Sequence, residues 1–140
     1  MELLESQPRR HSELILPMID RLLAEAGIKR SALDAVAFGR GPGSFTGVRI
    51  ATAVAQGIGY GLDRPVVPVS TLQALAQGAF RQAGARAVLA ALDARMDELY
   101  WGAFTLQDGL MQPDGEELVV APSEVPKPDS QNWTAAGSGW

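Results

Sequence analysis

The chain has 140 residues, of which 46% are apolar and 20% charged, the proportions of an ordinary soluble globular protein. Its net charge of −4 argues against a protein that binds nucleic acid by charge alone, because such proteins usually carry a basic face. The absence of cysteine excludes disulfides, a thiol nucleophile and thiolate metal sites. No apolar run approaches the roughly 18 residues of a membrane span, and no signal-peptide core is evident, so we expect a cytoplasmic protein that does not enter a membrane.

The first predicted element is a helix at residues 12–26, where apolar residues recur every three or four positions. Gly27 suits the position that follows a helix end. Pro17 removes one backbone hydrogen bond, so it indicates either a start in the first turn or a kink. A short buried strand is predicted at residues 35–38 (AVAF), ahead of the glycine-rich stretch GRGPGSFTG at residues 39–47.

A second helix is predicted at residues 44–62, followed by a strand at residues 66–69 and a third helix capped by Ser70 or Thr71. Both strands are uniformly apolar, which is typical of strands that are buried on both faces. The order strand, helix, strand, helix therefore predicts an α/β fold with parallel neighbouring strands.

The pattern changes near Gly84, where we place the boundary between a first lobe, residues 1–84, and a second lobe, residues 85–140. The stretch ALDARMDELYWGAFTL predicts a β-hairpin with its turn at residues 94–97. Asp108-Gly109 and Asp114-Gly115 are further turn signals. The segment APSEVPKPDSQNW carries three prolines and is predicted to be a loop, and the final TAAGSGW is predicted to begin a strand.

The hairpin carries a cluster of carboxylates, Asp93, Asp97 and Glu98, with Arg95 between them. Paired carboxylates can bind magnesium or transfer protons. A hairpin turn explains them equally well, since aspartate favours turns, and we favour the turn. His11 is the only histidine, and we interpret it as a polar residue near a helix start, because a lone histidine is poor evidence for a site.

The glycine-rich stretch does not match the common nucleotide motifs. A Walker phosphate loop requires a lysine that is absent here, and Ser44 stands where the dinucleotide pattern G-x-G-x-x-G requires its third glycine. Two interpretations remain. Ser44 and free backbone N–H groups could hold an anion at the helix start, or the stretch is a tight structural turn built from Gly41, Gly43, Ser44 and Gly47, which we favour.

The helix after this turn carries a row that contains only glycine and alanine: Gly47, Ala51, Ala55 and Gly59. Glycine inside a helix costs about 1 kcal/mol relative to alanine, so close packing is expected to offset the cost. The row could pack against the first helix of the same chain, which is the usual fate of an apolar stripe, or against a helix of a partner.

The segment FGRGPGSFTGVRIATAVAQGIGYGLDRPVVPVSTLQALAQ closely resembles the TsaB (YeaZ) family. The segments HSELILPMIDRLLAEAG before it and VLAALDARMDELYWGAF after it also resemble that family, so the similarity spans residues 11–104. Its central motif GPGSFTGVRI is specific, because it is far longer than a generic glycine loop.

The resemblance implies an incomplete actin-like ATPase fold, of the ASKHA and ribonuclease H-like type: a first-lobe sheet with flanking helices and the start of a second lobe. It also implies a role in the threonylcarbamoyladenosine modification of tRNA next to the anticodon. In that family the transferase chemistry belongs to a TsaD-like paralogue, and the TsaB-like protein is its non-catalytic partner. A TsaE-like P-loop ATPase joins them, so the resemblance implies no cofactor, metal or catalytic residue here, with ATP used by partner subunits.

The resemblance further implies a partner interface on the first two helices, for the paralogue or for a second copy in a homodimer, with tRNA involved only indirectly. The candidates are Leu14, Met18, Arg21 and Leu22 on the first helix, and Val48, Ala51, Thr52 and Ala55 on the second.

Family members begin with a strand of the type LALDTS, a strand hairpin and a third strand, all of which this chain lacks. The resemblance therefore implies that the chain is truncated at both ends. The missing first strand carries the acidic residue that actin-like enzymes place near nucleotide, so ATP binding is not expected. The alternative hypotheses are a stand-alone ATP-dependent phosphotransferase or hydrolase, and a homodimeric module that uses the same helices.

Overall fold

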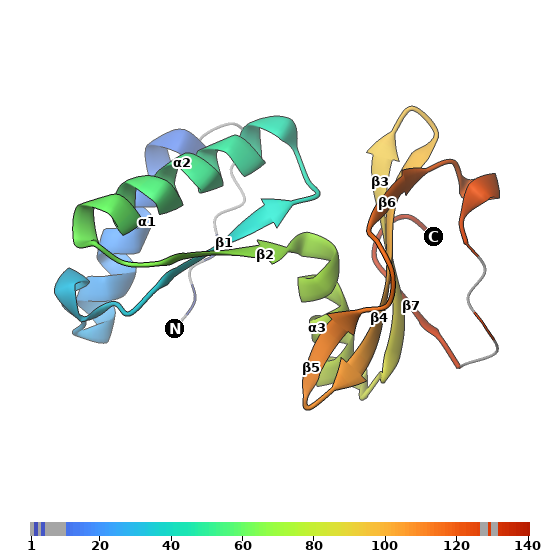
Figure 1. Ribbon diagram of the computed structural model, residues 1–140. Helices are drawn as coiled ribbons and strands as arrows, with labels where there is room; N and C mark the ends of the chain where they lie inside the picture. The colour runs from blue at the N-terminus through green and yellow to red at the C-terminus, as the bar shows by residue number, and fades with distance from the viewer. Residues whose placement is uncertain (1, 3, 5–10, 127–128, 130–131) are drawn as a thin grey trace. The chain divides into compact units, whose positions relative to one another are not determined.

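The computed structural model describes residues 2, 4, 11–126, 129 and 132–140, with the side chain of His11 outside that description. Within it the chain divides into two compact units (Figure 1). The first unit comprises Met1–Arg40 and Ser44–Pro68, and the second comprises Gly41–Gly43 and Val69–Trp140.

The first unit contains two helices and most of a two-stranded sheet. Its elements are α1 (His11–Ala26), a short 3-10 turn (Arg30–Ala32), β1 (Val36–Gly41), α2 (Phe45–Leu62) and β2 (Val66–Ser70). Strands β1 and β2 pair with each other, and their arrows point the same way in Figure 1, with α2 as the crossover between them. The predicted parallel α/β arrangement is thus confirmed for this pair.

The ends of the two helices follow from local sequence signals. Helix α1 ends in a Schellman motif: Gly27 has φ +66°, its N–H donates to Ala24, and the N–H of Ile28 donates to Leu23. Helix α2 begins after Ser44, whose side chain accepts a hydrogen bond from Gly47.

The predicted strand at residues 35–38 is too short, because β1 runs on to Gly41. The extension consists of Gly39, Arg40 and Gly41, and glycine supplies none of the side-chain pattern that indicates a strand. Part of the glycine-rich stretch is therefore strand rather than turn.

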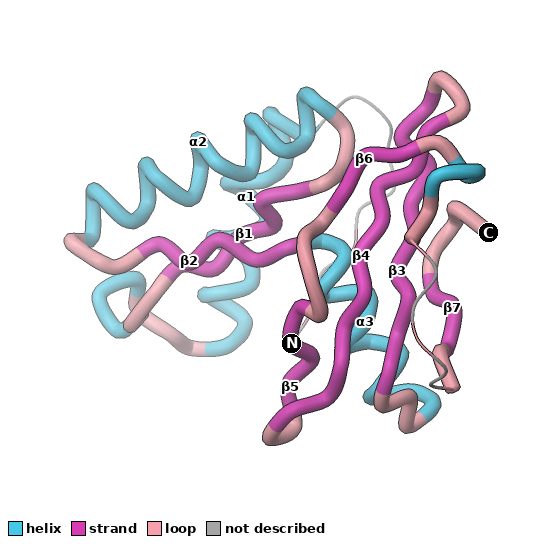
Figure 2. The backbone as a smooth tube through the Cα atoms, turned by 45° about the vertical axis from the view of Figure 1, so that its right-hand side comes forward, coloured by secondary structure: helices cyan, strands magenta, loops and turns pink. Residues whose placement is uncertain are grey.

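The second unit is a helix packed on a five-stranded sheet (Figure 2). Its elements are α3 (Thr71–Ala83), β3 (Ala87–Arg95), β4 (Glu98–Gln107), β5 (Leu110–Pro113), β6 (Leu118–Val120), a 3-10 turn (Pro122–Glu124) and β7 (Thr134–Ala136). The strand order is β5-β4-β3-β7, with β6 also paired to β4. Strand β3 is antiparallel to β4 and parallel to β7, and the predicted hairpin is β3–β4.

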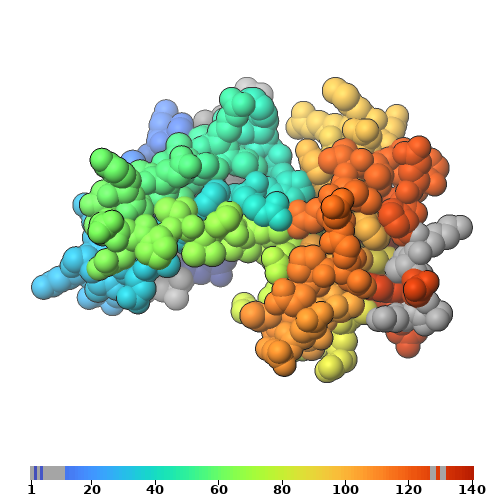
Figure 3. All heavy atoms as spheres, in the orientation of Figure 1, coloured from blue at the N-terminus to red at the C-terminus, as the bar shows by residue number. Residues whose placement is uncertain are grey.

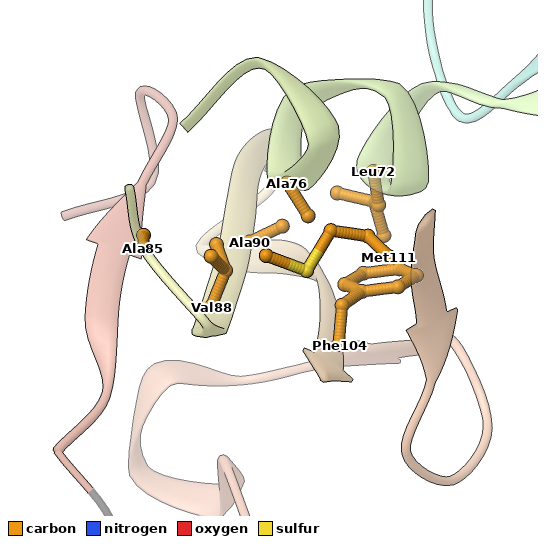
Figure 4. Close-up of a cluster of buried hydrophobic side chains, with 7 residues drawn as sticks. All are labelled: Leu72, Ala76, Ala85, Val88, Ala90, Phe104 and Met111. Carbon is orange, nitrogen blue, oxygen red and sulfur yellow. The ribbon is translucent and has the colours of Figure 1, made fainter. Parts of the chain in front are cut away.

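The larger cluster of buried side chains in the second unit lies between α3 and the sheet face beneath it (Figure 4). A separate buried cluster contains Ala91, Trp101 and Ala103. Leu72 and Ala76 of α3 face Val88 of β3, Phe104 of β4 and Met111 of β5, all 0% exposed. Helix α3 therefore belongs to the second unit. The boundary that we predicted near Gly84 is corrected to Val69, because the apolar face of α3 is buried by the strands that follow it.

The first unit is much less closed. Among its described residues, only Ala55 and Gly59 of α2 are buried, and the other apolar side chains of α1, β1 and α2 are half-buried or exposed. The outer side of α2 lies open on the face drawn in Figure 3. The first unit thus leaves apolar surface open, whereas the second unit contains large apolar side chains that are fully buried.

Candidate functional site

The turn ahead of α2 is held by its own side chain and backbone groups. The Ser44 hydroxyl accepts a hydrogen bond of 3.1 Å from the backbone N–H of Gly47. A β-carbon at Gly47 would lie 2.6 Å from that hydroxyl, so glycine is needed for the capping geometry. Gly41 has φ +95°, a conformation that favours glycine. Gly43 has no positive φ, so the geometry gives a reason for three of the four predicted turn residues.

The row of small residues on α2 is packed within this chain in two places, at the centre of the row and at the C-terminal end of the row. Ala55 is only 3% exposed. A β-carbon at Gly59 would overlap the side chain of Val66 in β2 and lie 3.0 Å from the carbonyl oxygen of Arg64. The methyl group of Ala55 is buried within the chain, which argues against a contact between Ala55 and a partner. The small residues of α2 therefore allow β2 to pack closely against the helix.

The other predicted residues of α2 remain partly accessible. Val48, Ala51 and Thr52 are half-buried, and the Thr52 hydroxyl donates to the carbonyl oxygen of Val48 at 2.8 Å. These three residues keep their place as interface candidates.

The outward face of α2 carries a stripe of exposed side chains that the sequence analysis did not identify. Phe45 is 71% exposed and Tyr60 is 94% exposed. Arg49 stacks over Phe45, with its guanidinium carbon 3.8 Å from the ring centroid. Positions 45, 49, 53, 56 and 60 follow helical spacing, so periodicity was the available signal. Exposed aromatic and arginine side chains are the types most enriched among binding hot spots.

The predicted residues of α1 differ in exposure. Leu14, Met18 and Leu22 are half-buried, while Arg21 is exposed. Arg21 donates to the Glu25 carboxylate one turn later, at 2.6 Å. This hydrogen bond and the charge of Glu25 raise the pKa of Arg21 above its ordinary value, so Arg21 stays cationic.

An apolar groove of 690 Å³ lies within the first unit, between α1, β1 and the end of α2. Its lining includes Leu16, Leu22 and Leu23 of α1, Val36 of β1 and Ile58 of α2. Its charged members, Asp20 and Arg30, pair with each other at 2.6 Å. The groove can therefore bury apolar surface, and its two charged side chains already form a salt bridge with each other.

The carboxylates of the hairpin take part in a turn. Arg95, Met96 and Asp97 all have positive φ, and the Asp93 carboxylate accepts a hydrogen bond of 2.7 Å from the backbone N–H of Arg95. Among the described residues, no group of three histidine, cysteine, aspartate or glutamate side chains is arranged to hold a metal ion. The side chain of His11 lies outside the described residues.

Across the part of the chain that the structure describes, none of the helices combines the length and hydropathy needed to cross a bilayer.

Comparison with known proteins places these features in a family. Residues 5–134 match the family model described as TsaD, tRNA N6-adenosine threonylcarbamoyltransferase. Curated relatives named tRNA threonylcarbamoyladenosine biosynthesis protein TsaB include that of Escherichia coli K12, 44% identical over 95% of this chain and 59% of the relative. The Haemophilus influenzae protein of the same name is 42% identical over 97% of this chain and 61% of the relative.

Solved structures agree. YeaZ from Pseudomonas aeruginosa superposes with a TM-score of 0.92 and is 55% identical, over 97% of this chain and 64% of that one. A second structure, described as an uncharacterized protein with similarity to peptidase YeaZ from Pseudomonas aeruginosa, gives a TM-score of 0.89 at 52% identity. The match covers 94% of this chain and 62% of the chain of that second structure. The expected incomplete actin-like α/β fold is thus confirmed, and the chain spans less than two thirds of the length of these proteins.

Proposed function

The chain belongs to the TsaB (YeaZ) family, and from that premise we propose that it is a non-catalytic partner subunit in the threonylcarbamoyladenosine modification of tRNA. In this proposal it binds a TsaD-like paralogue through α1 and α2 of the first unit. A TsaE-like P-loop ATPase joins the assembly, and the partner subunits use the ATP. The tRNA is involved only indirectly, through the other subunits.

The observation that carries the proposal is the contrast between the two units. In the second unit, Leu72, Val88, Phe104 and Met111 are fully buried. In the first unit, the long apolar side chains of both helices are half-buried or exposed. Apolar surface left open on a soluble domain marks an interaction site, and two helices side by side offer ridges and grooves to a partner's helices.

The proposed contact surface combines both helices. On α1 it includes Leu14, Met18, Arg21 and Leu22. On α2 it includes the half-buried Val48, Ala51 and Thr52, bordered by the exposed Phe45, Arg49 and Tyr60. Ala55 is not part of it. Half-buried apolar residues flanked by exposed aromatic and arginine side chains have the composition of an interface centre and its anchors.

The residue inventory supports a subunit without its own chemistry. These 140 residues contain one histidine and no cysteine, so they supply neither a histidine pair for a metal nor a thiol nucleophile. The side chains of Ser44 in the glycine-rich stretch and Asp93 in the hairpin each accept a hydrogen bond from a nearby backbone N–H.

Titration calorimetry of the chain against the TsaD-like paralogue from the same genome tests this proposal. We expect a one-to-one complex, and its formation should increase threonylcarbamoyladenosine synthesis in the reconstituted system. ATP hydrolysis by the isolated chain should stay at the buffer rate. No complex together with robust ATP turnover would instead support a stand-alone phosphotransferase or hydrolase.

Light scattering separates the homodimer alternative. If the same helices pair two copies of this chain, adding the paralogue should convert homodimer to heterodimer, because one surface cannot serve both at once. A homodimer that persists when the paralogue is bound would contradict a shared surface.

A further inference from the structure

Strand β5 (Leu110–Pro113) forms one edge of the second-unit sheet, since among the described strands it pairs only with β4. Antiparallel pairs alternate between residues that exchange hydrogen bonds and residues that do not. The N–H of Met111 donates to a side chain of α3 and not to β4. The polar backbone groups of Met111 therefore face the open side of the strand.

Two glutamines one turn apart on α3 occupy those outward groups. The Gln77 side-chain oxygen accepts the Met111 N–H at 2.8 Å. The Gln73 side-chain nitrogen donates to the Met111 carbonyl oxygen, also at 2.8 Å. The Gln77 nitrogen donates to the carbonyl oxygen of Gly109, in the turn before β5, at 3.1 Å. The two side chains thus make the hydrogen bonds that a neighbouring strand would make.

The remaining outward position of β5 is Pro113, which pairs opposite Phe104 and has no backbone N–H to offer. Within β5, the one outward N–H is therefore capped and the next outward position lacks one. An uncapped edge is a template for pairing with another chain, and natural sheets block such edges.

We propose that Gln73 and Gln77 act as a side-chain substitute for a missing strand and keep the β5 edge closed to a strand from a second copy of this chain. The arrangement goes beyond the proposed partner function, because it concerns the second unit and not α1 or α2. Packing alone does not require glutamine: methionine has a similar length and helix propensity and would fill the same half-buried positions.

The test uses the 140-residue chain with Gln73→Met and Gln77→Met together, compared with the unmodified chain and with the matched control Gln82→Met on an exposed position of α3. Near-ultraviolet circular dichroism checks folding. Amide hydrogen exchange reports on Met111, and sedimentation equilibrium reports on mass. We expect Met111 to exchange at least about ten-fold faster in the double variant, because its N–H loses its acceptor. We also expect mass to rise with concentration beyond that of the unmodified chain.

Adding Leu110→Lys to the double variant should return the mass to that of the unmodified chain, since an edge lysine opposes strand pairing. If the double variant does not fold, Gln77→Met alone should show the same two changes, smaller in size, because it removes the bonds to the Met111 N–H and the Gly109 carbonyl oxygen but keeps the Gln73 bond. A folded variant with unchanged mass would overturn the proposal, whether or not Met111 exchanges faster. So would association that Leu110→Lys leaves intact.

Discussion

Gly59 of α2 lies against Val66 of β2 so closely that no β-carbon fits between them. A β-carbon at Gly59 would also lie 3.0 Å from the backbone carbonyl oxygen of Arg64, which cannot rotate away as a side chain can. Glycine inside a helix costs about 1 kcal/mol relative to alanine. The close packing of α2 on β2 offsets that cost, and it places the C-terminal part of the small row, Ala55 and Gly59, in the interior of the first unit.

The first prediction tests this contact. Gly59→Ala should destabilise the chain by about 1–3 kcal/mol, because the added methyl forces α2 away from β2. Urea unfolding followed by circular dichroism measures the change.

Gly57 provides the matched control, since it is exposed on the same helix and a β-carbon there would meet nothing within 4 Å. Gly57→Ala should stabilise the chain by about 0.5–1 kcal/mol through helix propensity alone. Equal effects of the two substitutions would mean that Gly59 is not packed against Val66.

The second prediction concerns the helix cap. Ser44→Ala should cost about 1 kcal/mol of stability, while Ser44→Asp, which keeps an oxygen acceptor for the Gly47 N–H, should cost much less. Thermal unfolding measures both changes.

The same measurement separates a structural cap from an anion site. Inorganic phosphate should not raise the melting temperature of the unmodified chain more than that of Ser44→Ala. A phosphate-dependent increase that Ser44→Ala abolishes would favour the anion interpretation of the glycine-rich stretch.

Much of the secondary structure could be predicted from sequence because its signals are local. Gly27 ends α1, Ser44 begins α2 and Ser70 begins α3, and each does so through bonds within a few residues. The assignment of α3 to the second unit could not be read this way. It depends on contacts of Leu72 with strands that follow it in the chain, which local periodicity does not encode.

The third prediction concerns the hairpin carboxylates. Asp93→Ala should destabilise the chain by about 1 kcal/mol, because the Arg95 N–H loses its acceptor. Asp93→Asn keeps an oxygen in the same place and should be nearly neutral. Magnesium chloride should shift the melting temperature of the unmodified chain and of Asp93→Ala equally, whereas stabilisation confined to the unmodified chain would indicate a metal site.

The fourth prediction concerns partner binding. Arg21→Glu should weaken the complex with the TsaD-like paralogue at least about ten-fold, since it reverses a charge on the proposed contact surface. Stability should change little, because the Arg21–Glu25 pair is exposed. Arg81→Glu, an exposed helical arginine of the second unit, is the control and should bind normally. Equal affinities of the two variants for the paralogue would indicate that the interface lies away from α1.

The orientation of α2 could not be predicted from the sequence. Spacing identifies the small row of α2 but does not determine which way it faces, and Ala55 is an interface candidate only because the resemblance implies an interface on this helix. The opposite stripe, with Phe45, Arg49 and Tyr60, has the same periodicity. Only the position of β2 distinguishes the two faces, and that is a tertiary contact.

Amide hydrogen exchange of the chain, with and without the TsaD-like paralogue, tests the central claim most directly. The account predicts slower exchange in residues 12–26 and 45–62 on complex formation, with the strands at residues 87–113 unchanged. Protection confined to residues 87–113, or no protection anywhere, would contradict it.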